Sequence, residues 1–407
     1  MRAAAPVLLA LLLACAPPLQ GVRAWGAPGH MVTASLAERH LSAGAAASAA
    51  SDLQVFKSLY PTESEFVTAA DWRVSRGSVT LLSAPALTPP SAARLRPDFI
   101  KASTTAFSQW HYIDLPYAPA GDGGAPPVCS EAQNVVWALE NAAAVLRSAK
   151  SDAWSRSTML RFLIHFMGDL HQARGCRRQA LLPATRARSE PSCALRPAPQ
   201  PLHAASLYTA AAFPKGDEGG NSLKARCGAR RSTLRGAESR RRRASQLSPG
   251  VSVGADESAS ELHAFWDNGC GHSGLESVPR RDGVVDRKAV DALAAQLDGA
   301  DVAAVAATPL ASTSDVSAAF KAWAAESHAF ARNTSYAPAL LADLADGREA
   351  HTKAPYWAQY EAQASAVARQ RLRLGGARLA QVLNSLHHAA ASAAALTPLP
   401  PRDAATQ

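Results

Sequence analysis

The sequence predicts a mainly α-helical protein with a single folded domain, and three observations lead to this prediction. Of its 407 residues, 47% are hydrophobic and 18% are charged, which supplies enough apolar material for a large core. Apolar residues recur at helical spacing in six segments, whereas strand-like alternation is scarce. No glycine-rich phosphate loop follows a strand-like segment, so dinucleotide-binding and P-loop folds are poor candidates. The six segments span residues 31–41, 132–146, 159–170, 290–305, 316–330 and 357–386.

The N-terminus has the pattern of a secretory signal peptide. Arg2 precedes an apolar run over residues 3–16, and the small-residue pattern Val22-Arg23-Ala24 follows. We therefore expect residues 1–24 to be removed, so that the mature chain begins at Trp25 in the secreted space or in an endomembrane or vacuolar lumen. No later stretch reaches the roughly 18 apolar residues of a transmembrane segment, so none is expected.

Two arginine-rich stretches interrupt the predicted domain, which spans residues 25–388. Residues 173–200 contain six Arg against one Glu, and residues 225–252 contain eight Arg against one Glu. Together they carry more than the whole formal net charge of +9, so the basic pI does not indicate a nucleic-acid-binding face. Both lack hydrophobic periodicity, which is typical of disordered loops or of untranslated sequence retained in a gene model. The Pro/Ala-rich tail, residues 389–407, is also predicted to be disordered.

Two features outside these stretches fit an oxidising compartment. Cys129 and Cys270 are the cysteines that lie outside the signal peptide and the arginine-rich stretches, and the sequence leaves open whether they pair in a disulfide. The sequon at Asn333 predicts a glycosylated surface position.

Histidine and aspartate residues stand at the spacing of metal ligands. His165 and Asp169 are four residues apart within a predicted helix, so they share one helix face. His263 and Asp267 repeat this spacing. An ordinary polar helix face accounts for one such pair, but two pairs in one chain favour a metal site. Further candidate ligands in other segments are His30, Asp71, His111 and His203.

Eight short motifs run in order along the predicted mature chain. They are WGAPGH at 25, AAD at 69, WHYIDLP at 110, RFLIHFMGDLHQ at 161, PLH at 201, GGN at 219, ELHAFWD at 261 and GGARLAQVLN at 375. In this order they resemble the S1/P1 nuclease family, secreted zinc-dependent enzymes that cut single-stranded nucleic acids and remove 3′-phosphates. The resemblance implies a single helical domain of the zinc phospholipase C/P1 nuclease type. It also implies hydrolysis of single-stranded RNA and DNA to 5′-phosphorylated products, with 3′-nucleotidase activity, and we expect a monomer.

The same resemblance implies a cluster of three zinc ions. The ligands of the first would be Asp71, His111, His165 and Asp169. The ligands of the second would be His203, His263 and Asp267. The ligands of the third would be the α-amino group and carbonyl of Trp25, His30 and the bridging carboxylate of Asp169. Such an all-nitrogen and oxygen set suits a catalytic zinc site.

Catalytic roles are implied for Asp71 and Asp169. The family has an arginine three residues after Asp71, where this chain has Val74. Arg73 is therefore the candidate for stabilising the transition-state charge, with Arg76 as the alternative.

Substrate contacts are implied for three more residues. Tyr112 and Asp114 would belong to a pocket in which an aromatic ring stacks on an unpaired base and a carboxylate binds the base edge. Packing in the core is the alternative for Tyr112. Asn221 would either contact substrate or complete a turn.

The arginine-rich stretches break motifs that the family keeps together. Residues 173–200 separate Gln172 from Pro201, which are contiguous in the family, so the position of His203 is in question. One alternative function is therefore a secreted binding protein or pseudoenzyme with a damaged second zinc site. The other is a zinc phospholipase C of the same fold.

Two expectations concern residues beside the predicted ligands. His171 lies two residues after Asp169 and so on a different helix face, which predicts a supporting or surface role. Residues 26–29 contain two glycines and a proline, and we expect them to turn the chain so that the Trp25 amine meets His30.

Overall fold

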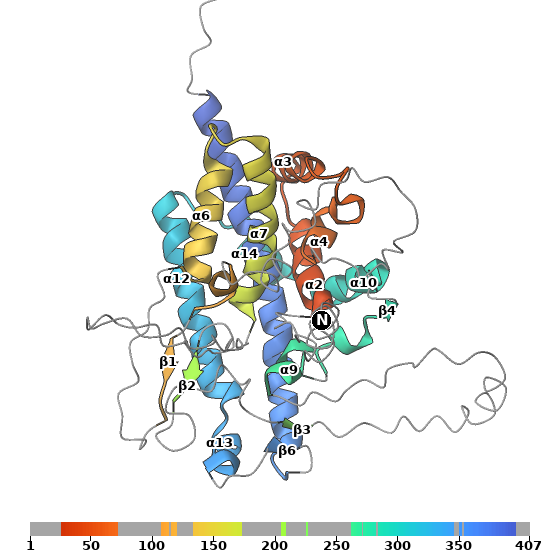
Figure 1. Cartoon of the computed structure of the whole chain (residues 1–407), viewed down its shortest axis with the longest axis vertical. Helices are drawn as coiled ribbons and strands as arrows, with labels where there is room; N and C mark the ends of the chain where they lie inside the picture. Colours follow the sequence, from red (N-terminus) through yellow and green to blue (C-terminus); the bar gives the residue numbers. More distant parts are fainter. Residues whose placement is uncertain are drawn as a thin grey trace, which may run out of the picture.

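The computed structural model is predominantly helical, which confirms the predicted fold class (Figure 1). It describes residues 26–71, 107–113, 115–119, 133–172, 205–208, 225–226, 262–270, 272–281, 284–345, 350–351 and 354–395. Within these ranges, strands form only two-residue pairs. They are the parallel pairs β1 (Pro116–Tyr117) with β2 (Ser206–Leu207) and β3 (Ala225–Arg226) with β6 (Ala350–His351), and the antiparallel pair β4 (Arg280–Arg281) with β5 (Val284–Val285).

The helices form the body of the molecule. The α-helices are α2 (Ala27–Glu38), α3 (Ala43–Gln54), α4 (Phe66–Ala69), α6 (Val135–Arg147), α7 (Ala153–His171), α9 (Leu262–Asp267), α10 (Arg287–Leu297), α11 (Ala300–Ala307), α12 (Thr313–Phe330), α13 (Pro338–Ala345) and α14 (Trp357–Ala395). Short 3₁₀ turns η1 (Pro61–Glu63), η3 (Ser108–His111) and η4 (Leu275–Ser277), and a π-helical turn η5 (Ala331–Ser335), join them.

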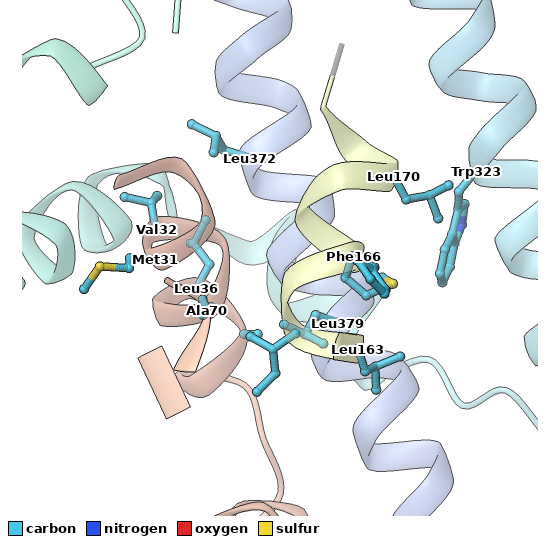
Figure 2. Close-up of a cluster of buried hydrophobic side chains, with 14 of the residues drawn as sticks. Met31, Val32, Leu36, Ala70, Leu163, Phe166, Leu170, Trp323, Leu372 and Leu379 are labelled. Carbon is cyan, nitrogen blue, oxygen red and sulfur yellow. The ribbon is translucent and has the colours of Figure 1, made fainter. Parts of the chain in front are cut away.

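Helices α2, α7 and α14 contact one another at the centre of the molecule, and α6 and α12 pack on the other side of α7 (Figure 1). The core between them is apolar. Figure 2 shows Leu36 of α2, Phe166 and Leu170 of α7, Leu379 of α14 and Trp323 of α12, all of which are buried. This packing fixes α7, which carries the predicted metal ligands His165 and Asp169, between neighbours on both sides.

Side-chain caps explain where the long helices begin. The Asp152 carboxylate accepts hydrogen bonds from the backbone N–H (2.9 Å) and the hydroxyl (2.7 Å) of Ser155 at the start of α7. These two hydrogen bonds lower the pKa of Asp152. Asn134 caps α6 in the same way through the Trp137 N–H. Such caps supply partners for backbone donors that a helix start leaves without intrahelical acceptors. With these caps, α7 begins six residues before the predicted start at 159, and α6 begins three residues after the predicted start at 132.

One predicted helix, residues 290–305, is two helices in the structure. The break between α10 and α11 falls at Asp298 and Gly299, where the Asp298 carboxylate accepts the Gly299 N–H (2.8 Å). The same carboxylate binds Arg39 and His40 of the segment after α2. Burial alone would raise the pKa of Asp298, but these hydrogen bonds outweigh burial and lower it. Periodicity could not show this break, because the apolar spacing continues across it.

Helix α3 and the end of helix α14 also differ from the prediction. Helix α3 was not predicted, because its sequence is rich in alanine and its apolar spacing is weak, although Ala45, Ala49 and Leu53 are buried. Helix α14 continues to Ala395, beyond the predicted domain boundary at 388, because alanine extends a helix readily. The predicted tail from residue 389 therefore begins as helix.

Two surface expectations can be compared with the structure. Asn333 is exposed on η5, which confirms the surface position predicted for the sequon. Among the described helices, none is both long enough and apolar enough to cross a membrane. Cys129 lies outside the described residues, so its pairing with Cys270 stays open.

Candidate active site

His30 lies in the first turn of α2, against α7. The chain turns at residues 26–29 as the first turn of this helix, which begins at Ala27, and the Gly29 N–H donates to the Gly26 carbonyl (2.7 Å). Trp25 lies outside the described residues, so the meeting of its amine with His30 stays a prediction. Pro28 is compatible with this start, since first-turn residues need no intrahelical N–H bond. The helix carries the His30 ring into the interior, where it is 2% exposed.

A glycine on α7 makes room for this ring. A Cβ atom at Gly168 would lie 2.5 Å from Nδ1 of His30, closer than real contacts allow. The His30 ring stacks on the ring of His165, with centroids 4.0 Å apart and planes inclined by 12°. Close approach of α2 and α7 at Gly168 therefore brings the two imidazoles together.

His165 and Asp169 lie one turn apart on α7 and face His30. Nε2 of His165 is 3.5 Å from Oδ2 of Asp169, and Nε2 of His30 is 3.6 Å from Oδ1. One ligand atom from each of the three side chains lies within 4.8 Å of the others, and all three are buried. Two imidazole nitrogens and a carboxylate oxygen form a donor set that zinc accepts. These three residues could therefore hold a metal ion.

His111 adds a third imidazole to the same carboxylate. It ends η3, and its Nδ1 donates to Oδ2 of Asp169 (2.9 Å). Its ring meets the His165 ring edge-on, with centroids 5.2 Å apart, and is fully buried. Asp169 thus has imidazoles on both of its oxygens, contributed by α2, η3 and α7.

The orientation of His165 is set by the chain that leads to Asp71. Nδ1 of His165 donates to the Ala70 carbonyl (3.1 Å), one residue before Asp71. Because Nδ1 then carries the proton, Nε2, which faces Asp169, carries the lone pair. Asp71 itself is half-buried at the end of the α4 segment. The sequence does not reveal the role of Ala70, because a backbone carbonyl has no signature in residue type.

Asp267 lies at the end of α9, one helical turn after His263. Its side chain is 8% exposed, and Oδ1 accepts a hydrogen bond from Nε2 of Gln172 (3.3 Å), the buried residue that follows α7. The Asp267 backbone carbonyl accepts the N–H of Gly26 (3.1 Å). The end of α9 is therefore joined both to the end of α7 and to the residue directly after Trp25. The contact of Gln172 with Asp267 was not predicted, although Gln172 stands only three residues after the predicted ligand Asp169.

Two residues beside the ligands are more buried than a surface role would require. Tyr112 is 7% exposed, so its ring offers little surface for stacking on a base in this structure. His171 is fully buried, which excludes the surface role; Nδ1 donates to the Met167 carbonyl (2.8 Å). Burial, followed by the charges of Arg371 and Arg378, holds the pKa of His171 well below its usual value.

The remaining predicted site residues cannot be compared with the structure. Outside the described residues lie Trp25, Arg73, Asp114, His203 and Asn221, and the side chain of His263. Their roles remain predictions.

Comparison with known protein families agrees with this geometry. The sequence model of the S1/P1 Nuclease family matches residues 25–173 and 249–388. The match includes His30, His111, His165 and Asp169, and it leaves out residues 174–248, which contain most of both arginine-rich stretches. A comparison with curated proteins found no match. Because the two matched segments make up well over half of its length, the chain belongs to the S1/P1 nuclease family.

Proposed function

We propose that the protein is a secreted zinc-dependent hydrolase that cleaves single-stranded RNA and DNA to 5′-phosphorylated products and removes 3′-phosphates from nucleotides. Membership of a nuclease family supports the reaction class. The observation that carries the proposal is the buried meeting of His30, His111 and His165 around the Asp169 carboxylate.

The donor set fits zinc. All four side chains offer nitrogen or oxygen atoms, and the described site contains no thiol, as is usual for catalytic zinc. Burial of a carboxylate also requires compensating positive charge, which a cation held by these residues supplies. Zinc bound here would lower the pKa of a water molecule and neutralise charge on phosphoryl oxygens.

The protein's own contribution is to orient this donor set. The Ala70 carbonyl selects the tautomer of His165, Gly168 admits the ring of His30, and Gln172 holds the Asp267 carboxylate. Because the ligands are already held in place, the site does not have to reorganise during the reaction. In our proposal Asp71, His203 and His263 complete the ligand set, with the Trp25 terminus. Arg73 stabilises developing charge, while Tyr112, Asp114 and Asn221 contact the substrate.

One observation supports a second candidate function, a pseudoenzyme or binding protein. The family match stops at residue 173 and resumes at 249, so His203 lies outside it. If the second zinc site is damaged in this way, the protein would retain the His30 and Asp169 cluster and bind fewer zinc ions. Zinc content measured on the secreted protein separates the two functions.

The proposed activity is tested with four substrates. We expect the purified secreted protein to cleave denatured DNA and single-stranded RNA, to release phosphate from 3′-nucleotides, and to leave phosphatidylcholine micelles intact. Chelation should abolish the activity and zinc should restore it. Hydrolysis of phosphatidylcholine without nuclease activity would instead identify a phospholipase C. Full nuclease activity in chelator would contradict the proposal.

A further inference from the structure

The C-terminal turn of α7 carries Asp169 and leads directly into Gln172. Carbonyl groups in the last turn of a helix have no intrahelical partner. Here neighbouring helices bind them. The Ser327 hydroxyl of α12 donates to the Leu170 carbonyl (2.6 Å), and Nε of Arg371 on α14 donates to the His171 carbonyl (3.0 Å). The end of α7 is thus attached to two other helices.

A cluster of three charged residues and one serine holds this attachment, and we call it the arginine clamp: Arg371, Arg378, Glu326 and Ser327. Arg371 donates to Oε1 of Glu326 (2.5 Å) and to the Ser327 hydroxyl (2.6 Å). Arg378 donates to Oε2 of Glu326 (2.6 Å) and to Nε2 of His171 (3.1 Å). The guanidinium groups therefore share one carboxylate, and each also contacts His171.

The clamp places positive charge where α7 favours it. Arg371 is 1% exposed, and its guanidinium lies at the C-terminal, negative end of the α7 dipole. Burial lowers the pKa of Arg371 to about 10, against the opposing effect of Glu326, so the group stays charged at neutral pH. A buried charge is tolerated only with such partners, which makes the geometry of the clamp specific.

We propose that Arg371 is a positioning residue for the metal centre. By holding the last turn of α7, the clamp keeps the Asp169 carboxylate toward His30 and His111 and keeps Gln172 on Asp267. Arg371 contacts none of these five side chains in the hydrogen bonds described above, so its effect passes through the backbone of α7. The inference rests on the proposed metal centre.

Arg156 provides a matched control, because it uses the same type of contacts at the other end of α7. Its Nη1 donates to the Leu146 carbonyl in the last turn of α6 (2.7 Å), and its Nε and Nη2 bind both oxygens of Asp52 (3.1 and 2.9 Å). It lies in the first turns of α7, away from Asp169. Loss of Arg156 should therefore lower stability without displacing the metal ligands.

The test compares zinc affinity with stability in Arg371→Lys and Arg156→Lys. Lysine keeps the charge but loses the planar fork that binds several acceptors. Zinc affinity is measured on the full chain by competition with a chromophoric chelator, and the melting temperature is measured on the chelated protein. We expect Arg371→Lys to weaken zinc binding by about tenfold or more, as supporting residues of metal sites do. Arg156→Lys should lower the melting temperature and leave zinc affinity unchanged.

Three results would overturn the inference. The first is a zinc affinity of Arg371→Lys equal to that of the wild type. The second is a decrease in zinc affinity that is proportional to the decrease in melting temperature, with the same proportion in Arg371→Lys and Arg156→Lys. The third is a wild-type protein that binds no zinc, which would overturn the proposed function as well. If Arg371→Lys does not fold, Ser327→Ala takes its place as the test variant. This smaller change removes the hydrogen bond from the Ser327 hydroxyl to the Leu170 carbonyl at the end of α7 and the one that the hydroxyl accepts from Arg371. Weaker zinc binding in that variant supports the inference, and unchanged binding contradicts it.

Discussion

Asp169 is the residue on which most of the candidate site depends. Its carboxylate is fully buried and has His30 on one oxygen and His111 and His165 on the other. A neutral amide of the same shape at this position would lose both the charge and one acceptor oxygen. The chemistry of the site should therefore respond to Asp169 more strongly than to any single residue of the second proposed zinc site.

Asp169→Asn is expected to lower nuclease activity by more than about 100-fold and to reduce zinc content. Asp267→Asn should cost less, because Asp267 serves only one proposed ion. Asp298→Asn is the control. Like Asp169, Asp298 binds a histidine, here together with an arginine, but it lies in a different part of the molecule. Initial rates on denatured DNA and zinc content report the effect. Near-normal activity in Asp169→Asn would contradict the metal-centre assignment.

His328 predicts a pH dependence of stability away from the metal site. Burial, followed by the charge of Arg332, lowers the pKa of His328 below 6.5, although a hydrogen bond to the Pro116 backbone opposes the shift. The unfolded chain therefore takes up a proton near pH 6.5 that the folded protein does not. The free energy of unfolding should fall as the pH decreases below this value.

His328→Gln should reduce this loss. Urea unfolding of the wild type and the variant gives the free energy of unfolding of each protein at pH 7.5 and pH 5.5. The difference between the two proteins in their loss of stability isolates His328, because the other histidines contribute equally to both. An equal loss of stability in both proteins would show that His328 does not carry the effect.

At the scale of helices, the sequence predicts α7 well and its contacts poorly. Periodicity and the spacing of His165 and Asp169 place both residues on one helix face, which the structure confirms. The contact of His30 with Gly168 depends on how α2 packs against α7, and no local pattern encodes that packing. The roles of Ala70 and Arg371 depend on backbone carbonyls, which also have no sequence signature. Sequence reasoning therefore finds ligands more readily than the groups that orient them.

Gly168→Ala tests the close approach of α2 and α7. The added methyl group would collide with the His30 ring, so we expect the ring to shift and zinc affinity to fall by about tenfold. Alanine favours helix, so propensity alone would make this change stabilising. Gly44→Ala is the control: its methyl group would meet the end of the His387 side chain, which can move. Zinc affinity in Gly168→Ala equal to that in Gly44→Ala would contradict this role.

At the scale of the whole molecule, the proposed ligands come from segments far apart in the sequence. His30, His111 and His165 lie on three different elements and meet in one buried place. An ion that binds the folded protein and not the unfolded chain stabilises the fold by mass action. The metal centre should therefore contribute to stability as well as to catalysis.

Chelation is expected to lower the melting temperature of the wild-type protein. Zinc at about 100 times its Kd would contribute about 2.7 kcal/mol to the free energy of unfolding. Differential scanning calorimetry with and without chelator measures the shift, and re-addition of zinc should reverse it. The shift should be much smaller in Asp169→Asn. An identical melting temperature for the wild type in both conditions would contradict the prediction.

The first arginine-rich stretch can be removed without touching any described site residue. Deletion of residues 173–200 joins Gln172 to Pro201 and restores the contiguous family motif, so zinc content and activity should be kept or raised. The closure entropy of a chain segment grows only slowly with its length, so the fold should form with or without the 28 residues 173–200. Loss of both zinc and activity on deletion would show that the stretch is part of the site.

The most direct test of the central claim, that α2, η3 and α7 build a zinc centre for nucleic-acid hydrolysis, is the zinc content of the purified secreted protein. Zinc per chain is measured by mass spectrometry after removal of loosely bound metal, on a sample assayed in parallel with denatured DNA. We predict three zinc ions per chain and loss of activity as they are removed. A protein that contains no zinc and cleaves denatured DNA at full rate would contradict the claim.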